Sequence, residues 1–266
     1  MTATATPRRD AFLAALRQDF PPVDLFGVRV DAVPLGELAR RLIEHLETAD
    51  GPIHIVTLNP EILERALREP ATLPLVTRAE LIVPDGVGIR LASRRLASRK
   101  LPSVPGVDLA HELLRLSAAR GWEVFLLGGA PGVAETAADR LKAEIPGLNI
   151  VGSDHGYHRD TPQDPKGETR VVNTLTAIQP DLLLVGMGFP RQEEFIARLR
   201  LHLKRGIVIG VGGSLDVFAG TVTRAPRWVG ALNLKWLWRM AAQPKRWKRF
   251  PMLLAFARRV LFSQKT

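Results

Sequence analysis

A chain of 266 residues with 46% hydrophobic and 24% charged residues has the composition of a globular protein, which excludes disorder or a coiled coil as a description of the whole. It is long enough for one large α/β domain or two small ones. The lack of cysteine excludes a disulfide-bonded scaffold, a cysteine-ligated zinc site and a thiol nucleophile, and it fits a reducing cytoplasm. The net charge of +10 indicates an anionic partner.

Residues 1–24 are predicted to form a polar tail and a short helix ahead of the main domain. The helix has apolar positions at Phe12, Leu13 and Leu16, and we expect it to be loosely attached. The residues around Arg8 and Arg9 include no continuous apolar stretch, so a cleaved signal peptide is not expected. No segment approaches the ~20 apolar residues of a membrane-spanning helix, so any membrane contact is expected at the surface.

Residues 25–216 alternate between strand-like and helix-like patterns. The strand candidates are Leu25–Val30, Ile53–Leu58, Leu81–Pro84, Glu123–Leu127, Asn149–Val151, Leu182–Gly186 and Ile207–Gly210. The helix candidates include Leu35–Leu46, Val87–Ala97, Asp108–Ala119, Pro131–Glu144, Thr169–Ile178 and Gln192–Leu203. Because several strands are continuous Val, Ile and Leu runs separated by helices, the pattern predicts a Rossmann-like, doubly wound α/β fold with a mostly parallel sheet.

The residues that follow the strands are the candidates for a site, because ligands of a doubly wound sheet bind outside the carboxyl ends of its strands. Thr57 and Asn59 lie at one strand end, where a hydroxyl and an amide can orient a substrate. Asn59 also suits the cap of a helix that begins at Pro60. Asp85 lies at a strand-to-helix edge, where a carboxylate can act as a general base, although Asp85-Gly86 is also a common turn sequence.

Three further strands end in glycine-rich turns. Gly128 and Gly129 precede a helix whose N-terminus offers N–H groups to a phosphate. The other two turns lie at 186–194 and 210–216 and carry polar side chains. Together the turns predict a small-molecule pocket, although neither a Walker motif nor a GxGxxG fingerprint occurs. His155 and His158 show no tight metal-binding spacing, so neither a protein-bound metal nor a Ser-His-Asp triad is expected.

Residues 217–266 differ from the rest in composition and are predicted to form a basic helical appendage. They contain eleven Lys and Arg, no Asp or Glu, and four of the five tryptophans, whereas the remaining chain has 26 basic and 27 acidic residues. Such a segment suits a polyanionic partner with an apolar layer beside it, as at a membrane surface. The alternative is a nucleic-acid-binding module on an α/β scaffold. An NAD-dependent oxidoreductase is disfavoured by the missing fingerprint.

The motifs, taken in order, resemble the WecG/TagA/CpsF family of bacterial glycosyltransferases over roughly residues 25–250. The matching segments are Thr57-Leu58-Asn59-Pro60-Glu61, Pro84-Asp85-Gly86-Val87-Gly88, Leu126–Gly132, Val151-Gly152 with His155-Gly156-Tyr157, Val185–Glu193, Gly210–Gly213, Arg224–Trp228, Leu234–Arg239 and Gln243–Arg246. No single segment is decisive, but their common order is highly specific.

The resemblance implies an inverting, metal-independent and cofactor-free transfer of a sugar from a UDP-sugar to a sugar on a polyprenyl diphosphate. This reaction belongs to cell-surface polysaccharide synthesis, at the inner face of the cytoplasmic membrane. By motif, Asp85 matches the catalytic base, and three arginines match contacts to the acceptor diphosphate, namely Arg239, Arg246 and Arg249. The residues assigned to substrate binding are Thr57, Asn59, Gly86, Gly128, Gly129, Gly188, Gln192, Glu193, Gly212 and Gly213.

The sequence departs from the usual family pattern at three positions. Ser103 stands where an arginine is common, Lys235 where a glutamate is usual, and Gln243 where an acidic residue is frequent. The last two differences make the appendage more basic. They leave the reaction class unchanged. The donor sugar stays open, because members of the family use N-acetylmannosamine, its uronic acid or glucose-type sugars. A homo-oligomer is possible, and the sequence leaves this open too.

Overall fold

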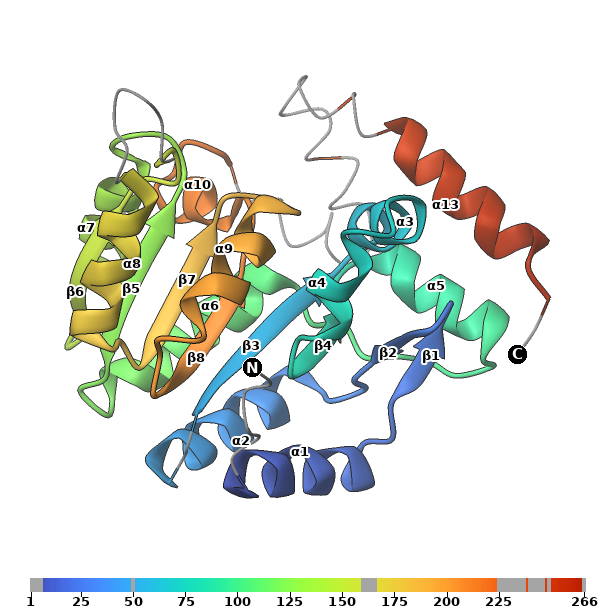
Figure 1. Cartoon of the computed structure of the whole chain (residues 1–266), viewed down its shortest axis with the longest axis horizontal. Helices are drawn as coiled ribbons and strands as arrows, with labels where there is room; N and C mark the ends of the chain where they lie inside the picture. Colours follow the sequence, from blue (N-terminus) through green and yellow to red (C-terminus); the bar gives the residue numbers. More distant parts are fainter. Residues whose placement is uncertain are drawn as a thin grey trace.

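A six-stranded parallel sheet forms the centre of the molecule (Figure 1). The structure is a computed structural model that describes residues 7–48, 51–158, 167–223, 238, 247 and 250–264. The strand order is β4-β3-β8-β7-β5-β6. The strands are β3 (Gly51–Leu58), β4 (Leu81–Pro84), β5 (Glu123–Gly128), β6 (Asn149–Asp154), β7 (Leu182–Gly186) and β8 (Arg205–Gly210).

Helices cover both faces of the sheet, which explains why its central strands are buried along almost their whole length. One face packs against α1 (Pro7–Asp19), α2 (Leu35–Thr48), α6 (Gly106–Ala118), α7 (Val133–Glu144) and α10 (Ser214–Phe218). The other face carries two separate clusters. The first cluster joins β3 and β4 to α3 (Pro60–Arg68), α4 (Leu73–Thr77), α5 (Val87–Leu96) and α13 (Phe250–Phe262). The second joins β5, β7 and β8 to α8 (Gly167–Ile178) and α9 (Arg191–Leu199).

The predicted fold class is confirmed, and six of the predicted strands lie within the sheet. The seventh, Leu25–Val30, is wrong as a single strand. It is divided between β1 (Val23–Leu25) and β2 (Val28–Val30), which pair antiparallel outside the main sheet. The chain reverses at Phe26 and Gly27, whose φ angles of 59° and 80° are the conformation that a tight hairpin requires.

The expectation of a loosely attached N-terminal helix is also wrong. Leu16 of α1 is completely buried in the main core. On the next residue, Arg17 Nε donates to Asp31 Oδ1 over 3.0 Å and its Nη2 donates to the carbonyl of Glu80 over 2.6 Å. Asp31 is itself buried and accepts from the backbone N–H of Ile82, so α1 is attached to the sheet by both packing and charge.

The C-terminal helix α13 packs beside α3 and α5 (Figure 1). Its side chains Phe256 and Val260 are buried in the cluster over β3 and β4. Arg259 donates from Nε and Nη2 to the two carboxylate oxygens of Glu64 on α3, over 2.8 and 3.2 Å. The rest of the predicted appendage lies mostly outside the described residues, so the division of the chain at residue 217 stays a prediction.

Glu64 is the buried acceptor of this contact, with 1% of its side chain exposed. Burial alone would raise the pKa of Glu64, but hydrogen bonds from Arg259 and from Arg68 outweigh it and lower the pKa below its ordinary value. A carboxylate whose pKa is lowered by folding stabilises the folded state above its ordinary pKa. That stabilisation is lost as the pH falls through the lowered value.

We therefore expect Arg259→Leu to lower the free energy of opening of α13 by about 2 kcal/mol near neutral pH, because Glu64 loses two charged hydrogen bonds. Hydrogen exchange of the α13 amides measures this. The control is Arg115→Leu on α6, which breaks an exposed pair with Glu112 and is expected to change the stability by less than about 0.5 kcal/mol. Unchanged exchange in α13 would show that its docking does not depend on this ion pair.

Candidate active site

The carboxyl ends of the parallel strands bring the predicted site residues to one edge of the sheet. Leu58 and Pro84 are register partners at the ends of β3 and β4, and Gly128 and Gly186 are partners at the ends of β5 and β7. The residues that follow these strands therefore surround a common region. It has β3 and β4 on one side and β5, β7 and β8 on the other (Figure 1).

Asp85 lies directly after β4, half-buried at this edge. Its backbone N–H donates to the carbonyl of Leu58 over 2.8 Å, which fixes it beside the end of β3. Its carboxylate Oδ2 lies 3.5 Å from the backbone N–H of Gly106, the first residue of α6. The N-terminus of α6, the positive end of its dipole, therefore faces a carboxylate at the rim of the sheet.

Gly106, whose N–H lies near this carboxylate, was not among the residues that the sequence assigned to the candidate site. A Cβ atom at this position would lie 3.1 Å from the side chain of Thr57, so glycine lets the start of α6 approach both Thr57 and Asp85. The only signal in the sequence is Pro105-Gly106 ahead of an apolar helical run. That pattern predicts a helix boundary and says nothing of the carboxylate that meets it.

Thr57 and Asn59 both lie at this edge, and each makes a structural hydrogen bond. The hydroxyl of Thr57 donates to the carbonyl of Gly210 over 3.0 Å, tying β3 to the end of β8. The Oδ1 atom of Asn59 accepts from the N–H of Ile62 over 3.0 Å and caps α3, as the alternative interpretation of Asn59 predicted. A contact of either side chain with a substrate stays a prediction.

Gln192 holds two of the glycine turns together. Its Oε1 accepts from the N–H of Gly188, after β7, over 3.0 Å and from the N–H of Gly212, after β8, over 3.1 Å. Its Nε2 donates to Oε1 of Glu193 over 2.9 Å. Only 2% of Gln192 is exposed, so its side chain lies in the interior and links the two turns from there. Its contact with a substrate stays a prediction.

Glu193 is completely buried, since none of its surface is exposed, and its assignment to substrate binding stays a prediction. It lies against the backbone of Gly210, where a Cβ atom would be 2.7 Å from its Oε1. Its other oxygen, Oε2, has no hydrogen-bond partner among the described residues. Burial raises the pKa of Glu193 to about 7, although the hydrogen bond from Gln192 acts in the opposite direction.

The remaining predicted glycines form the backbone of the turns. Gly128 leaves room for the neighbouring strand, since a Cβ atom there would be 2.5 Å from the carbonyl oxygen of Gly186. Gly129 donates from its N–H to the same carbonyl over 3.0 Å, and the turn continues into α7. Gly86 precedes α5 and Gly213 precedes α10. The turns are thus brought together as predicted, and their contacts with a substrate stay predictions.

A histidine cluster that the sequence interpretation set aside lies at the end of β6. Asp154, His155 and His158 offer possible ligand atoms within 4.8 Å of one another. These groups already interact, because Nε2 of His158 lies 2.8 Å from Oδ1 of Asp154 and the two imidazole rings stack with centroids 4.0 Å apart. Binding of one metal by both histidines would require this stack to change. The expectation of no metal stays a prediction.

The three arginines assigned to the acceptor, Arg239, Arg246 and Arg249, lie outside the described residues. Within the part of the chain that the structure describes, no helix combines the length and apolarity needed to cross a membrane.

A model of the WecG/TagA/CpsF glycosyl transferase family matches residues 23–266, and the chain therefore belongs to this glycosyltransferase family. A similar protein of Bacillus subtilis (strain 168) is named N-acetylglucosaminyldiphosphoundecaprenol N-acetyl-beta-D-mannosaminyltransferase. It is 34% identical over 211 residues, which cover 79% of this chain and 80% of that protein. A protein of the same name from Staphylococcus aureus (strain NCTC 8325) is 35% identical over 242 residues, covering 89% of this chain and 90% of that one.

The raised pKa of Glu193 predicts a specific pH dependence of stability. The folded state holds a proton on Glu193 between its ordinary pKa of 4.5 and about 7, so the free energy of unfolding falls as the pH rises through this range. We expect Glu193→Gln, which cannot ionise, to lack this fall. Its stability relative to the wild type should therefore improve by up to about 3 kcal/mol between pH ~5 and ~8, as urea unfolding at both pH values measures.

The matched control is Glu194→Gln, a neighbouring carboxyl that is exposed to solvent. Its difference from the wild type should stay constant with pH to within about 0.5 kcal/mol. A constant difference for Glu193→Gln as well would mean that Glu193 is ionised in the folded protein throughout this range.

Proposed function

We propose that this protein transfers a sugar, with inversion, from a UDP-sugar to a sugar carried on a polyprenyl diphosphate, in cell-surface polysaccharide synthesis. The observation that carries the proposal is the placement of Asp85 at the sheet edge, against the N-terminus of α6, in a chain of this family. Relatives named for transfer to N-acetylglucosaminyldiphosphoundecaprenol support the choice of acceptor.

Asp85 is the proposed general base. In a single displacement, its carboxylate takes the proton of the acceptor hydroxyl while that oxygen attacks the anomeric carbon of the donor sugar. The bond between this carbon and the nucleoside diphosphate breaks, and the diphosphate leaves with the bonding electrons. Attack from the face opposite to the leaving group inverts the configuration of the anomeric carbon.

The leaving diphosphate needs positive charge or N–H donors, because negative charge develops on it as the bond breaks. The N-terminus of α7, which follows the turn at Gly128 and Gly129, is the proposed source of N–H donors. Arg239, Arg246 and Arg249 are the proposed contacts to the acceptor diphosphate, since a guanidinium can bind phosphate oxygens in pairs. With these groups, neither a metal nor a cofactor is part of the proposal.

The proposed location is the inner face of the cytoplasmic membrane, where a lipid-linked acceptor is exposed to a cytoplasmic donor. The eleven cations and no anions of residues 217–266 support contact with an anionic membrane surface. N-acetylmannosamine is the donor sugar named for the relatives. We propose that the donor sugar here is the same or a related hexose. The positions where specificity for the donor or the acceptor can differ are Ser103, Lys235 and Gln243.

The donor class predicts selective stabilisation by uridine nucleotides. UDP at a hundredfold excess over its Kd should stabilise the folded protein by about 2.7 kcal/mol, which raises the unfolding temperature by several degrees. A thermal-shift comparison of UDP with NAD measures this. Equal shifts for the two nucleotides, or none for UDP, would contradict the proposed donor.

Asp85→Asn tests the mechanism directly. We expect the rate of sugar transfer from UDP-sugars to a lipid-diphosphate-sugar acceptor to fall by about 100- to 10,000-fold, because asparagine cannot take the proton. The fold should survive, since the asparagine oxygen can still accept from Gly106. Asp139→Asn, on the exposed side of α7, is the control and should keep the wild-type rate. Full activity in Asp85→Asn would remove Asp85 from the mechanism.

A further inference from the structure

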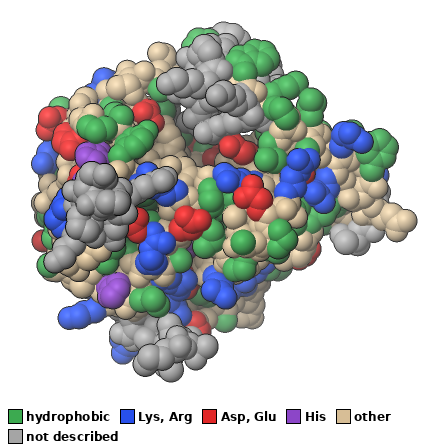
Figure 2. All heavy atoms as spheres, turned by 45° about the horizontal axis from the view of Figure 1, so that its top comes forward, with side chains coloured by type: hydrophobic (Ala, Val, Ile, Leu, Met, Phe, Trp, Pro, Cys, Tyr) green, Lys and Arg blue, Asp and Glu red, His purple; other side chains and the backbone are tan. Residues whose placement is uncertain are grey.

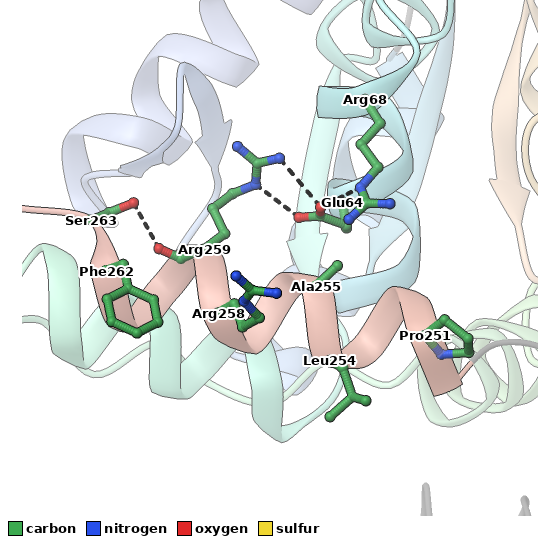
Figure 3. A pocket seen from close by; sticks show the side chains of 9 residues that line it. All are labelled: Glu64, Arg68, Pro251, Leu254, Ala255, Arg258, Arg259, Phe262 and Ser263. Atoms are coloured by element: carbon green, nitrogen blue, oxygen red, sulfur yellow. Dashed lines mark hydrogen bonds and ion pairs between the residues drawn. The ribbon is translucent and has the colours of Figure 1, made fainter.

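A groove lies between α3 and α13, on the opposite face of the sheet from α6. Its volume is about 680 Å³, and Figure 3 shows the side chains that line it. The lining residues are Glu64, Arg68, Pro251, Leu254, Ala255, Arg258, Arg259, Phe262 and Ser263. We call this feature the basic groove. Neither the proposed chemistry nor the docking of α13 accounts for its open side.

The charges of the basic groove are unbalanced in favour of cations. Among the described residues that line it, Glu64 is the only acidic one, and it already accepts hydrogen bonds from Arg259 and from Arg68. Arg258 is exposed, and no acidic side chain of the described residues pairs with it. The basic groove therefore carries two more positive than negative charges, an excess that suits an anion.

The outer face of α13 is apolar although it is exposed to solvent. Leu254, Leu261 and Phe262 are 51%, 63% and 83% exposed. At 100° per residue, Arg258 lies on the helix surface between Leu254 and Phe262, so a cation stands within this apolar face. Figure 3 shows Leu254 and Phe262 pointing away from α3, whereas Arg259 points toward Glu64. Figure 2 shows basic and hydrophobic side chains next to each other on the right of the molecule.

An apolar face that surrounds a cation fits the surface of an anionic bilayer. Exposed aliphatic and aromatic side chains can enter the apolar layer while an arginine extends to the headgroup phosphates. A second copy of this chain fits less well, because α13 contains no acidic residue and two such faces would bring like charges together. Nucleic acid would leave the apolar side chains exposed to water.

We propose that the basic groove binds the headgroup phosphate of an anionic phospholipid between Arg68 and Arg258, with the outer face of α13 lying on the bilayer. The site combines a residue of the catalytic body with one of the C-terminal helix, so lipid binding would orient the body as well as attach the tail. The inference rests on the proposed function, which takes residues 217–266 to an anionic membrane surface, and it adds the residues that bind a headgroup there.

Binding to vesicles of phosphatidylcholine with and without phosphatidylglycerol tests the proposal on the full chain. We expect Arg68→Gln/Arg258→Gln to weaken binding to the anionic vesicles by about tenfold or more, since each cation near such a surface contributes about a factor of five. Glutamine at position 68 can still donate to Glu64, which protects the docking of α13. The matched control is Arg115→Gln/Arg120→Gln, with Arg115 in the last turn of α6 and Arg120 just after this helix. It removes the same charge from the other face of the sheet and should change binding by less than about twofold.

A second variant tests the apolar face. Leu261→Ser/Phe262→Ser should weaken binding to both kinds of vesicle while leaving the unfolding temperature unchanged, because both side chains are largely exposed. The proposal is overturned if the two arginine pairs have equal effects, if the serine variant binds vesicles as the wild type does, or if an oligonucleotide binds more tightly than anionic vesicles at the same salt concentration. Wild-type transfer to a detergent-dispersed acceptor tests the proposed function separately, because that assay contains no bilayer.

Discussion

One side-chain amide determines the shape of the candidate site. Gln192 accepts the N–H groups of Gly188 and Gly212 on a single oxygen, so the turns after β7 and β8 have a fixed separation. The amide fits beneath them only because Gly210 has no side chain, a Cβ atom there being 2.4 Å from Nε2 of Gln192. Thr57 extends the connection to β3 through its bond to the carbonyl of Gly210, and β3 in turn holds Asp85 through Leu58. The proposed base and the glycine turns are therefore positioned by one connected set of hydrogen bonds.

Two buried glutamates show that the groups around a carboxyl decide whether burial raises or lowers its pKa. Glu64 and Glu193 are both almost completely buried, yet folding lowers the pKa of the first and raises that of the second. Glu64 faces two guanidinium groups, which stabilise its charge, whereas Glu193 receives one hydrogen bond from a neutral amide. The first acid accordingly attaches an appendage through an ion pair. The second belongs to the interior of the site and can lie there uncharged.

The parallel sheet and the location of the site were predictable because each depends on a local pattern. Apolar runs such as Leu182–Gly186 identify buried strands, and polar or glycine residues directly after them must lie at one edge. What could not be predicted depends on partners distant in sequence. Nothing near Glu193 distinguishes a buried acid from an exposed one such as Glu194, and Gly106 shows its importance only beside Asp85 and Thr57. The hairpin at Phe26 was missed because a phenylalanine seldom adopts a positive φ.

The attachment of α13 to α3 also has a topological consequence. Glu64 and Arg259 are 195 residues apart in the sequence, so their ion pair joins two distant parts of the described chain. Bringing such distant residues together costs little more entropy than closing a shorter stretch, because the cost grows only slowly with length. The Glu64–Arg259 contact and the burial of Phe256 and Val260 act against this small entropy cost. Cutting the chain just before α13 would remove none of these contacts, yet it would turn the docking of one helix into the association of two molecules, with the entropy cost that association carries.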